Sequence, residues 1–198
     1  MIKVQAESKL PTDFGKFKIV AFSETENDWM PHIALISENT DFKGVVNVRI
    51  HSECVTGEIF HSQKCECGQQ LDASMKYIDE NGGIILYLRQ EGRNIGIINK
   101  IKAYQLQEMG FDTVEANLKL GLPADGRDFS VAVEILNILG VEKINLLTNN
   151  PDKLSFVENS NIQLVKRIPL NIKANNINKS YLETKKSYFG HLFETALT

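Results

Sequence analysis

The chain has 198 residues, of which 42% are hydrophobic and 24% are charged, and its formal net charge is −3. This balance is close to that of an average soluble protein and supplies enough apolar side chains for a buried core. The small negative charge excludes a general attraction to nucleic acid or to an anionic membrane, so any site for an anion must be a local cluster of lysine and arginine.

The start of the chain, MIKVQAESKLPTDFGKF, contains no apolar run of the kind that marks a signal peptide. No uninterrupted apolar segment approaches the roughly 18 residues that a membrane-spanning helix needs. The three cysteines are clustered and odd in number, which argues against a disulfide framework. We therefore expect a cytoplasmic protein that binds neither a membrane nor a nucleic acid.

Residues 1–50 are predicted to be rich in strands. Apolar and polar residues alternate in three short runs, FGKFKIVAFSE, HIALISE and GVVNVRIHSE, which polar turns separate. This pattern favours an antiparallel arrangement for the N-terminal third of the chain. The last run leads directly into the first cysteine.

Helices and strands are expected to alternate from residue 68 to residue 168, which indicates an α/β region. Glycine ends the first three predicted helices, and an asparagine N-cap followed by proline begins the fourth. The predicted helices cover 68–83, 95–109, 129–139, a short segment from Asn150-Pro151, and 178–193. The predicted strands cover 84–88, 143–148 and 162–168. The polar segment 112–128 is expected to be an irregular loop with a function.

Apolar residues give two of these helices candidate packing faces. In 95–109 they are Ile97, Ile98, Ile101 and Leu106, and in 178–193 they are Tyr181, Tyr188, Leu192 and Phe193. We expect an α+β fold in a single domain, with a mixed β-sheet, an antiparallel N-terminal part and flanking helices. Residues 1–172 would form the body of this domain, and 173–198 a helical tail packed on it.

The stretch from His51 to Cys67 holds all three cysteines of the chain, Cys54, Cys65 and Cys67. Zinc takes thiolate ligands in tetrahedral geometry, and a catalytic zinc commonly has three protein ligands and one position for water. The spacing therefore predicts a three-thiolate zinc site at which the pKa of bound water falls towards ~7. Two alternatives stay open: His51 or His61 closes the site as a fourth ligand, or the cysteines are inert buried thiols.

Three polar segments are candidates for binding an anion. In RQEGRNIG, Gly92 allows close backbone approach, a helix N-terminus follows, and arginine offers paired donors suited to phosphate. ADGRD places Asp125 and Arg127 in the long loop. TNNPDK places Thr148 at a strand end and Lys153 on the next helix, a common ligand position in α/β sheets. Plain turns and helix caps are the alternative.

Two further patterns are compatible with a catalytic site. Lys100 and Tyr104 are four residues apart and share one helix face. A tyrosine directed into a site can donate a proton, and the alternative is a half-buried packing tyrosine. His51-Ser52-Glu53 is similar to the H-x-E half of the zinc-deaminase signature, but the P-C-x-x-C half is absent.

Taken together, these segments resemble the GTP cyclohydrolase II family, whose members open the guanine ring of GTP at the start of riboflavin biosynthesis. The matching segments occur in order and with compatible spacing over about residues 45–170. They are RIHSECVTGE, KCECGQQL, LRQEGRNIGIINKIKAYQLQ, DTVEAN, ADGRDF and LLTNNPDK.

The resemblance implies three groups of site residues. The zinc ligands are Cys54, Cys65 and Cys67. The catalytic residues are Asp125 as proton acceptor, Arg127 as nucleophile towards the α-phosphate, and Tyr104 in the ring chemistry. The substrate contacts are Arg49, Ile50, His51, Ser52, Glu53, Gln70, Glu91, Gly92, Arg93, Thr113, Thr148 and Lys153.

The resemblance also implies a catalytic Zn²⁺ in each chain, Mg²⁺ with the GTP triphosphate, and a homodimer. The implied products are formate, pyrophosphate and 2,5-diamino-6-ribosylamino-4(3H)-pyrimidinone 5′-phosphate. Glu91 and Gln70 could pair with the Watson–Crick edge of guanine and reject adenine. Because arginine is essentially always protonated, charge stabilisation by Arg127 with direct attack of water is physically simpler than nucleophilic attack by Arg127. We expect a monofunctional chain, without the synthase domain that is fused to some relatives.

Two other functions fit parts of the sequence. One is a paralogue that binds zinc and a purine nucleotide but completes only part of the reaction or acts as a sensor. The presence of Tyr104, Asp125 and Arg127 disfavours it. The other is a non-enzymatic zinc module that binds RNA, which the net charge of −3 and the lack of an aromatic and basic stripe disfavour.

Overall fold

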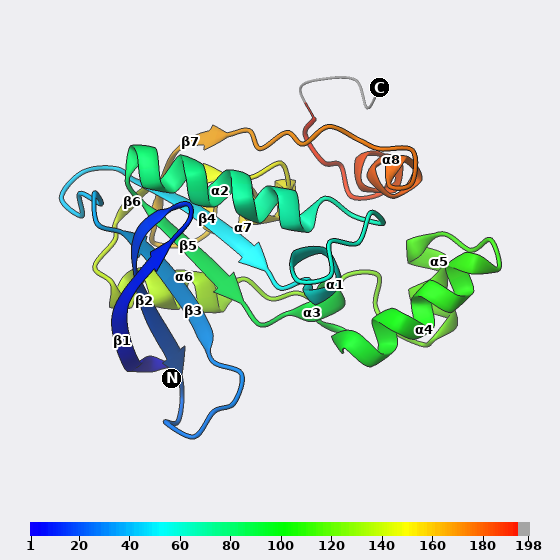
Figure 1. Ribbon diagram of the computed structural model, residues 1–198, viewed down its shortest axis with the longest axis horizontal. Helices are drawn as coiled ribbons and strands as arrows, with labels where there is room; N and C mark the ends of the chain where they lie inside the picture. The colour runs from blue at the N-terminus through cyan, green and yellow to red at the C-terminus, as the bar shows by residue number, and fades with distance from the viewer. Residues whose placement is uncertain (194–198) are drawn as a thin grey trace.

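The computed structural model describes residues 1–193, and within them the strands form a single seven-stranded sheet in the order β1-β2-β3-β5-β4-β6-β7 (Figure 1). The strands are β1 (Lys3–Thr12), β2 (Gly15–Ser23), β3 (His32–Ser37), β4 (Val46–Ser52), β5 (Ile84–Leu88), β6 (Lys143–Leu147) and β7 (Gln163–Ile168). The sheet is mixed and open, and helices flank it, so the predicted α+β fold is confirmed.

Most of the predicted helices are present with nearly the predicted bounds. The helices within residues 1–193 are α1 (Val55–Glu58), α2 (Cys67–Asn81), α3 (Glu91–Asn94), α4 (Gly96–Glu108), α5 (Thr113–Lys119), α6 (Ser130–Ile138), α7 (Pro151–Glu158) and α8 (Lys179–Ser187). The predictions that correspond to α2, α4, α6 and α7 are confirmed, as are the strands β5, β6 and β7. In this part of the chain, no helix has both the length and the apolar character that crossing a bilayer demands.

Strand direction divides the sheet into two parts. β1, β2, β3 and β5 pair antiparallel in that order, whereas β5, β4, β6 and β7 pair parallel. The antiparallel prediction for the N-terminal third is therefore correct for β1 to β3 and wrong for β4. β4 is joined to β5 through α2, the kind of crossover that parallel strands require. The carboxyl ends of the four parallel strands consequently meet at one edge of the sheet.

The central strand β5 packs against helices on both faces of the sheet, which explains why it is apolar throughout. Ile84 and Leu86 belong to one core cluster together with Ile135 of α6. Ile85 points the other way and belongs to a second cluster with Met75 of α2. A strand that is buried on both faces loses the alternation of an exposed strand and becomes a continuous apolar run.

The prediction of an irregular loop over 112–128 is wrong for its first part, which forms the helix α5. Its start is a capping box. The Asp112 carboxylate accepts hydrogen bonds from the backbone N–H groups of Val114 and Glu115, and the Glu115 carboxylate accepts one from the N–H of Asp112. The signal for this helix is the D-x-x-E cap and not apolar periodicity.

The C-terminal helix is shorter than predicted, because α8 ends at Ser187 and the described chain continues without regular structure to residue 193. Two of the predicted packing residues are exposed, Tyr188 at 60% and Leu192 at 42%, whereas Leu182 is a buried apolar residue of α8. The last part of the predicted tail, 194–198, lies outside the described residues.

The apolar face predicted for α4 is present but is largely exposed in the part of the chain that the structure describes. Ile98 and Ile101 are 70% and 51% exposed, and Ile97 is exposed as well. The buried residue of α4 is Ala103, on another face of the helix. The isoleucine spacing therefore predicted the helix correctly and its environment wrongly.

Candidate active site

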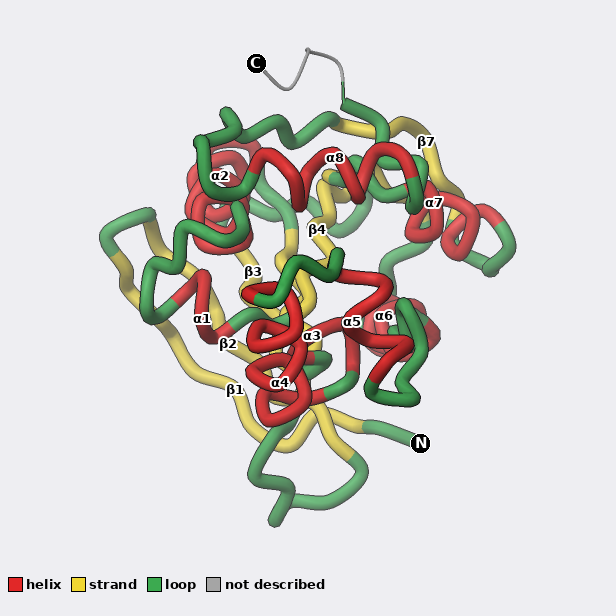
Figure 2. The backbone as a smooth tube through the Cα atoms, turned by 90° about the vertical axis from the view of Figure 1, so that its right-hand side faces the viewer, coloured by secondary structure: helices red, strands yellow, loops and turns green. Residues whose placement is uncertain are grey.

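A cavity of about 410 Å³ opens where the carboxyl ends of the parallel strands meet. Residues that follow β4 and β6 line it, together with residues of α4 and α8. In Figure 2, α8 lies above the end of β4, and α3 and α4 lie below it. The carboxyl edge of parallel strands is the common ligand position in α/β sheets.

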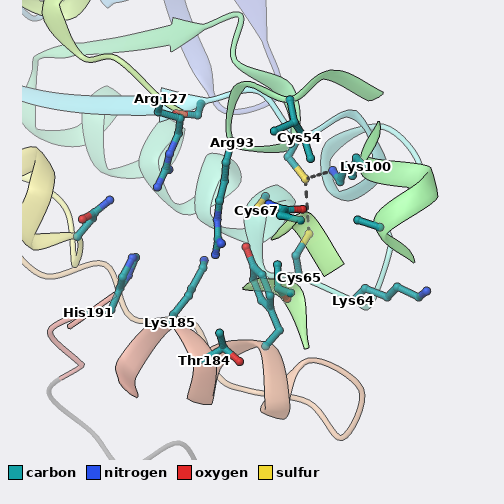
Figure 3. Close-up of a pocket in the computed structure, with 18 of the residues that line it drawn as sticks. Cys54, Lys64, Cys65, Cys67, Arg93, Lys100, Arg127, Thr184, Lys185 and His191 are labelled. Carbon is teal, nitrogen blue, oxygen red and sulfur yellow. Dashed lines mark hydrogen bonds between the residues drawn. The ribbon is translucent and has the colours of Figure 1, made fainter. Parts of the chain in front are cut away.

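The three cysteines reach this cavity from three adjoining segments. Cys54 precedes α1, Cys65 lies in the following loop, and Cys67 is the first residue of α2. The three Sγ atoms all lie within 4.8 Å of one another, and those of Cys54 and Cys65 are 3.6 Å apart (Figure 3). Among residues 1–193 the cluster includes no histidine, since Nε2 of His51 lies 2.8 Å from Oε1 of Glu58 instead. This geometry favours three thiolate ligands over a site closed by histidine.

Two glycines allow the cysteine-bearing segments to approach closely. A Cβ atom on Gly57 would lie 2.8 Å from Sγ of Cys65 and 3.4 Å from Sγ of Cys54. A Cβ atom on Gly68 would lie 2.4 Å from the carbonyl oxygen of Gly57. A larger side chain at either position would push α1 away from the start of α2, so the glycines of CVTGE and CECG are part of the site.

The three thiols do not ionise independently. The pKa of Cys54 lies well below its usual value, mainly because Cys65 and Cys67 donate hydrogen bonds to its sulfur. The charge of the Lys100 ammonium lowers this pKa further. The hydrogen bond to Cys54 in turn raises the pKa of Cys65 to about 11, and the pKa of Cys67 is raised for the same reason. The protein alone therefore favours one thiolate, whereas three thiolates require a cation. Soft thiolate ligands suit Zn²⁺, so the donor set fits zinc.

Glu58, for which the sequence analysis gave no role, holds the segment around Cys54 in place. Its Oε1 atom accepts a hydrogen bond from the backbone N–H of Cys54 at 2.8 Å and lies 2.8 Å from Nε2 of His51. Its Oε2 atom accepts a hydrogen bond from the Tyr87 hydroxyl at 2.5 Å. The sequence signal that points to this residue is a carboxylate four positions after a cysteine, C-x-x-x-E, within one helical turn.

Lys100 and Tyr104 extend from α4 toward the cysteines. The Tyr104 hydroxyl lies 3.4 Å from Oγ1 of Thr56, which lies 3.7 Å from Sγ of Cys54. The Lys100 ammonium donates hydrogen bonds to Sγ of Cys54 at 3.1 Å and to Oε1 of Glu91 at 2.8 Å. Burial raises the pKa of Tyr104, so at neutral pH its hydroxyl keeps the proton that a general acid would donate.

Asp125 and Arg127 form a largely buried ion pair beside the cavity. Nε of Arg127 donates hydrogen bonds to both carboxylate oxygens of Asp125, at 2.9 and 3.1 Å, and Nη2 donates to Oδ2. Burial opposes the charge on each group, but the pairing outweighs it. The pKa of Arg127 is raised and the pKa of Asp125 is lowered. At neutral pH Arg127 is therefore a cation and Asp125 an anion.

Arg93 enters the cavity from an unusual turn. Gly92, Arg93 and Asn94 all have positive φ angles, of 63°, 59° and 68°. This conformation costs roughly 1 kcal/mol or more for a residue with a Cβ atom. Two hydrogen bonds join the turn to the loop that carries Arg127. The N–H of Gly126 donates to the carbonyl of Arg93 at 3.1 Å, and the Asn94 amide donates to the carbonyl of Gly126 at 3.0 Å. Strained turns of this kind cluster at functional sites.

Two buried cations, Arg49 and Lys153, lie under the cavity. The Arg49 guanidinium donates a hydrogen bond to Oε1 of Gln70 at 2.9 Å, and the Lys153 ammonium donates one to the carbonyl oxygen of Ile50 at 2.8 Å. Burial, with the nearby charges of Arg49 and Arg127, lowers the pKa of Lys153 well below its usual value. The Nε atom of Arg49 is buried without a partner in the described part of the chain.

Most of the predicted substrate contacts line this one cavity. They are Arg49, His51, Ser52, Glu53, Gln70, Gly92, Arg93, Thr113, Thr148 and Lys153. Ile50 lies in the hydrophobic core instead and contributes its carbonyl oxygen to Lys153. Glu91 uses both carboxylate oxygens within the protein, since Lys100 donates to one and the N–H of Val55 donates to the other at 2.7 Å. Because each carboxylate oxygen can accept more than one hydrogen bond, guanine would bind Glu91 either beside these contacts or in place of one of them.

Residues of α8 and of the segment after it complete the cavity lining, although no sequence motif indicated them. Tyr181, expected as a packing residue, lines the cavity, and so do Lys185 and His191, which point toward Arg93 and Arg127 in Figure 3. The basic residues of the lining are Arg49, Lys64, Arg93, Lys100, Arg127, Lys153 and Lys185. The acidic residues are Glu53, Glu108 and Asp112. The cavity is thus cationic, in a chain whose net charge is −3.

The chain is similar to known proteins over most of its length. Residues 3–169 match the family model described as GTP cyclohydrolase II. The chain is 52% identical over 191 residues to "Riboflavin biosynthesis protein RibBA" of Staphylococcus epidermidis, a match that covers 96% of this chain and 48% of that protein. It is 49% identical over 191 residues to "GTP cyclohydrolase-2" of Histophilus somni, a match that covers 96% of this chain and 88% of that protein.

The chain therefore spans about half the length of the RibBA relatives that it matches. Among solved structures it is similar to "Crystal structure of RibBX, a two domain 3,4-dihydroxy-2-butanone 4-phosphate synthase from A. baumannii". The identity is 18% and the TM-score is 0.48, over 87% of this chain and 40% of that chain.

Proposed function

Because the chain belongs to the GTP cyclohydrolase II family, we propose that it hydrolyses GTP as the first step of riboflavin biosynthesis. The reaction would open the imidazole ring of guanine and release formate, pyrophosphate and 2,5-diamino-6-ribosylamino-4(3H)-pyrimidinone 5′-phosphate. The observation that carries the proposal is that a cluster of three thiols and a cluster of cations line the same cavity. The thiols suit a metal for ring opening, and the cations suit a triphosphate.

In this proposal Cys54, Cys65 and Cys67 hold a zinc ion at the ring-opening end of the cavity. When bound, zinc supplies a Lewis acid that makes hydroxide available from water at neutral pH. Lys100 donates a hydrogen bond to Cys54 and so offsets part of the negative charge of three thiolates. Tyr104, whose hydroxyl is protonated and lies close to Thr56, would give a proton to a ring nitrogen as the C–N bond opens.

Guanine would lie between the cysteines and the ends of β4 and β5. Ser52, Glu53 and Gln70 line this part of the cavity and offer donors and acceptors for the edge of a base. The role of Gln70 and Glu91 in selecting guanine rests on the family resemblance. Adenine has a different pattern of donors and acceptors on this edge, so the hydrogen bonds proposed between guanine and these two residues would not form with adenine.

The triphosphate would lie among the cations at the other end of the cavity, and Mg²⁺ bound with it would supply further positive charge. Arg127 offers a planar pair of donors that matches two phosphate oxygens. Because Asp125 keeps Arg127 protonated, we assign Arg127 to charge stabilisation at the α-phosphate and not to nucleophilic attack. Asp125 then holds the guanidinium in position. Water attacks the α-phosphorus, and pyrophosphate leaves.

Binding of a polyphosphate is expected to take up a proton through Lys153. Burial lowers the pKa of Lys153 well below the usual value of 10.5 in the protein alone, and phosphate oxygens beside it would raise that pKa again. At pH values between the lowered and the usual pKa of Lys153, the affinity for a polyphosphate should fall as the pH rises. The fall should be up to about tenfold per pH unit. Calorimetric titration with tripolyphosphate in two buffers of different ionisation enthalpy measures the uptake. Undiminished uptake in Lys153→Met would contradict this assignment.

We also propose a homodimer, which the exposed isoleucines of α4 support. Exposed apolar patches of this kind mark protein interfaces. The change Ile98→Asp should shift the sedimentation coefficient from that of a dimer to that of a monomer, because it places a charge in the apolar contact. Trp29→Asp is the control, since Trp29 is exposed in a loop distant from α4 in sequence. A dimer that survives Ile98→Asp would place the interface elsewhere.

The direct test is to incubate the protein with GTP, zinc and magnesium and to measure formate and pyrophosphate. Release of both products in equal amounts is the expected result, with no release from ATP. Formate without pyrophosphate, or the reverse, would support the paralogue that completes only part of the reaction. Release of neither product would overturn the proposed hydrolase and leave a non-enzymatic zinc module as the alternative.

A further inference from the structure

The helix α8 brings a cation into the cavity from outside the region that defines the family. The match to the family model ends at residue 169, whereas α8 begins at Lys179. Lys185 is only 8% exposed and lines the cavity. In Figure 3 its side chain extends from α8 toward Arg93. A lysine buried at this depth needs a partner of opposite charge.

The partner of Lys185 lies within the cysteine cluster. The Lys185 ammonium donates a hydrogen bond to Oε1 of Glu66 at 2.6 Å, and Glu66, between two cysteines, is 2% exposed. The same oxygen accepts a hydrogen bond from Gln70 at 3.2 Å. An ammonium group has three N–H donors, and Glu66 is the one hydrogen-bond acceptor of Lys185 among residues 1–193. The ammonium is therefore held in place with donors left for a ligand.

The segment after α8 is fixed to the walls of the same cavity. The N–H of Leu192 donates a hydrogen bond to the carbonyl of Asn149 at 2.8 Å, and the N–H of His191 donates one to the carbonyl of Lys185 at 3.0 Å. The Arg93 guanidinium lies 4.2 Å from the centre of the Phe189 ring, within the range of a cation–π contact. These contacts place Lys185 and His191 on the same side of the cavity, facing the cations of the family motifs.

The cations at this end of the cavity outnumber the acids that neutralise them. Within residues 1–193, Lys185 pairs with Glu66 and Arg127 pairs with Asp125. Arg93 and Lys153 donate hydrogen bonds to backbone carbonyl groups instead. Burial and these neighbouring cations lower the pKa of His191 to about 2. A ligand with several negative charges would relieve this repulsion.

We propose that Lys185 binds a phosphate group of the substrate, so that α8 forms one wall of the active site and completes its phosphate end. The chemistry that Lys185 recognises is that of a polyphosphate. The identification of this polyphosphate as GTP rests on the proposed function. Glu66 is then a positioning residue, which links the phosphate-binding lysine to the segment that carries Cys65 and Cys67.

The test compares Lys185→Met with Lys186→Met, because Lys186 is the next residue of α8 and is exposed. Calorimetry with inorganic tripolyphosphate should show about 10- to 100-fold weaker binding for Lys185→Met, as expected for the loss of a charged hydrogen bond. Lys186→Met should bind like the wild type. With GTP, KM should rise by a similar factor while kcat changes less than about threefold.

Because Lys185→Met leaves the buried Glu66 carboxylate without its partner, two further variants separate binding from folding. Lys185→Arg keeps the charge and should bind tripolyphosphate within about fivefold of the wild type. The double variant Glu66→Gln with Lys185→Met removes both charges of the buried pair, and it should still bind tripolyphosphate weakly. A purely structural role predicts the opposite: Lys185→Met would lose zinc or kcat, and its affinity for tripolyphosphate would stay unchanged.

The outcomes separate this inference from the proposed function. If the wild type releases both products from GTP but Lys185→Met binds tripolyphosphate as tightly as Lys186→Met, the role of Lys185 is wrong and the enzyme assignment stands. If the wild type releases neither product and tripolyphosphate binding still depends on Lys185, the polyphosphate site stands and the GTP reaction is wrong.

Discussion

Replacing Cys54 with serine should remove zinc from the protein and stop formate release from GTP, while some pyrophosphate release persists. A serine hydroxyl does not supply the thiolate that zinc requires, and only two of the three cysteine ligands would remain. Zinc content should fall from about one ion per chain to a small fraction of that. Formate release should fall by at least about a hundredfold, since loss of even an outer partner of a metal ligand costs 10- to 100-fold. In the proposed reaction pyrophosphate release uses the cations and magnesium and not the cysteines, so it should fall less.

The matched control is the wild type, stripped of metal by a chelator and then supplied with zinc. Formate release should return in the wild type and not in Cys54→Ser. Metal analysis on the same samples relates the activity to zinc content. Full formate release by the zinc-free variant would contradict the role of the cysteine cluster.

Replacing Arg127 with alanine should reduce pyrophosphate release by about a thousandfold or more, the effect of removing an arginine that stabilises a phosphoryl-transfer transition state. Arg127→Lys keeps the charge but loses the paired donors that bind Asp125, so it should still lose at least about tenfold. Asp125→Asn should lose less than Arg127→Ala, because it loosens the guanidinium without removing it. Steady-state assays of pyrophosphate measure all three variants.

A rapid-quench experiment that follows Arg127 distinguishes two mechanisms of pyrophosphate loss. If water attacks the α-phosphorus directly, rapid quenching of a reaction with GTP labelled at the α-phosphate should yield no labelled protein. Arg127 would then act only as a cation, as its ion pair with Asp125 indicates. Recovery of a phosphorylated Arg127 from the quenched protein would show that it is the nucleophile and would require a deprotonated guanidine in the reaction.

The fold could be predicted from the sequence wherever a local pattern and the final environment agree. The apolar spacing of α2 and α6 and the run of β5 correspond to buried faces, so periodicity located them within two residues. The isoleucines of α4 have the same periodicity but are exposed. Local sequence patterns do not distinguish an exposed apolar helix face from a buried one. The direction of β4 depends on which strands lie beside it. Strand neighbours are a property of the whole sheet, so local alternation could not supply them.

The residues of the candidate site also differ in how far local sequence patterns could reveal them. The spacing of Cys54, Cys65 and Cys67 indicated a metal centre because the three ligands are close in sequence. Asp125 and Arg127 were predicted as site residues from the ADGRD motif of the family resemblance, and the two residues lie close together because they belong to one loop. Lys185 could not be found in this way, because 119 residues separate it from Glu66. Only the packing of α8 across the carboxyl edge of the sheet brings the two together.

The joined turns that carry Arg93 and Arg127 also bear on the entropy of binding. Gly126 exchanges hydrogen bonds with Arg93 and Asn94 within the protein itself. The two loops are thus ordered when the chain folds, and the cost of ordering them is not subtracted from the affinity for the substrate. A one-residue insertion between α5 and Gly126 would separate the two guanidinium groups while leaving both residues in the sequence.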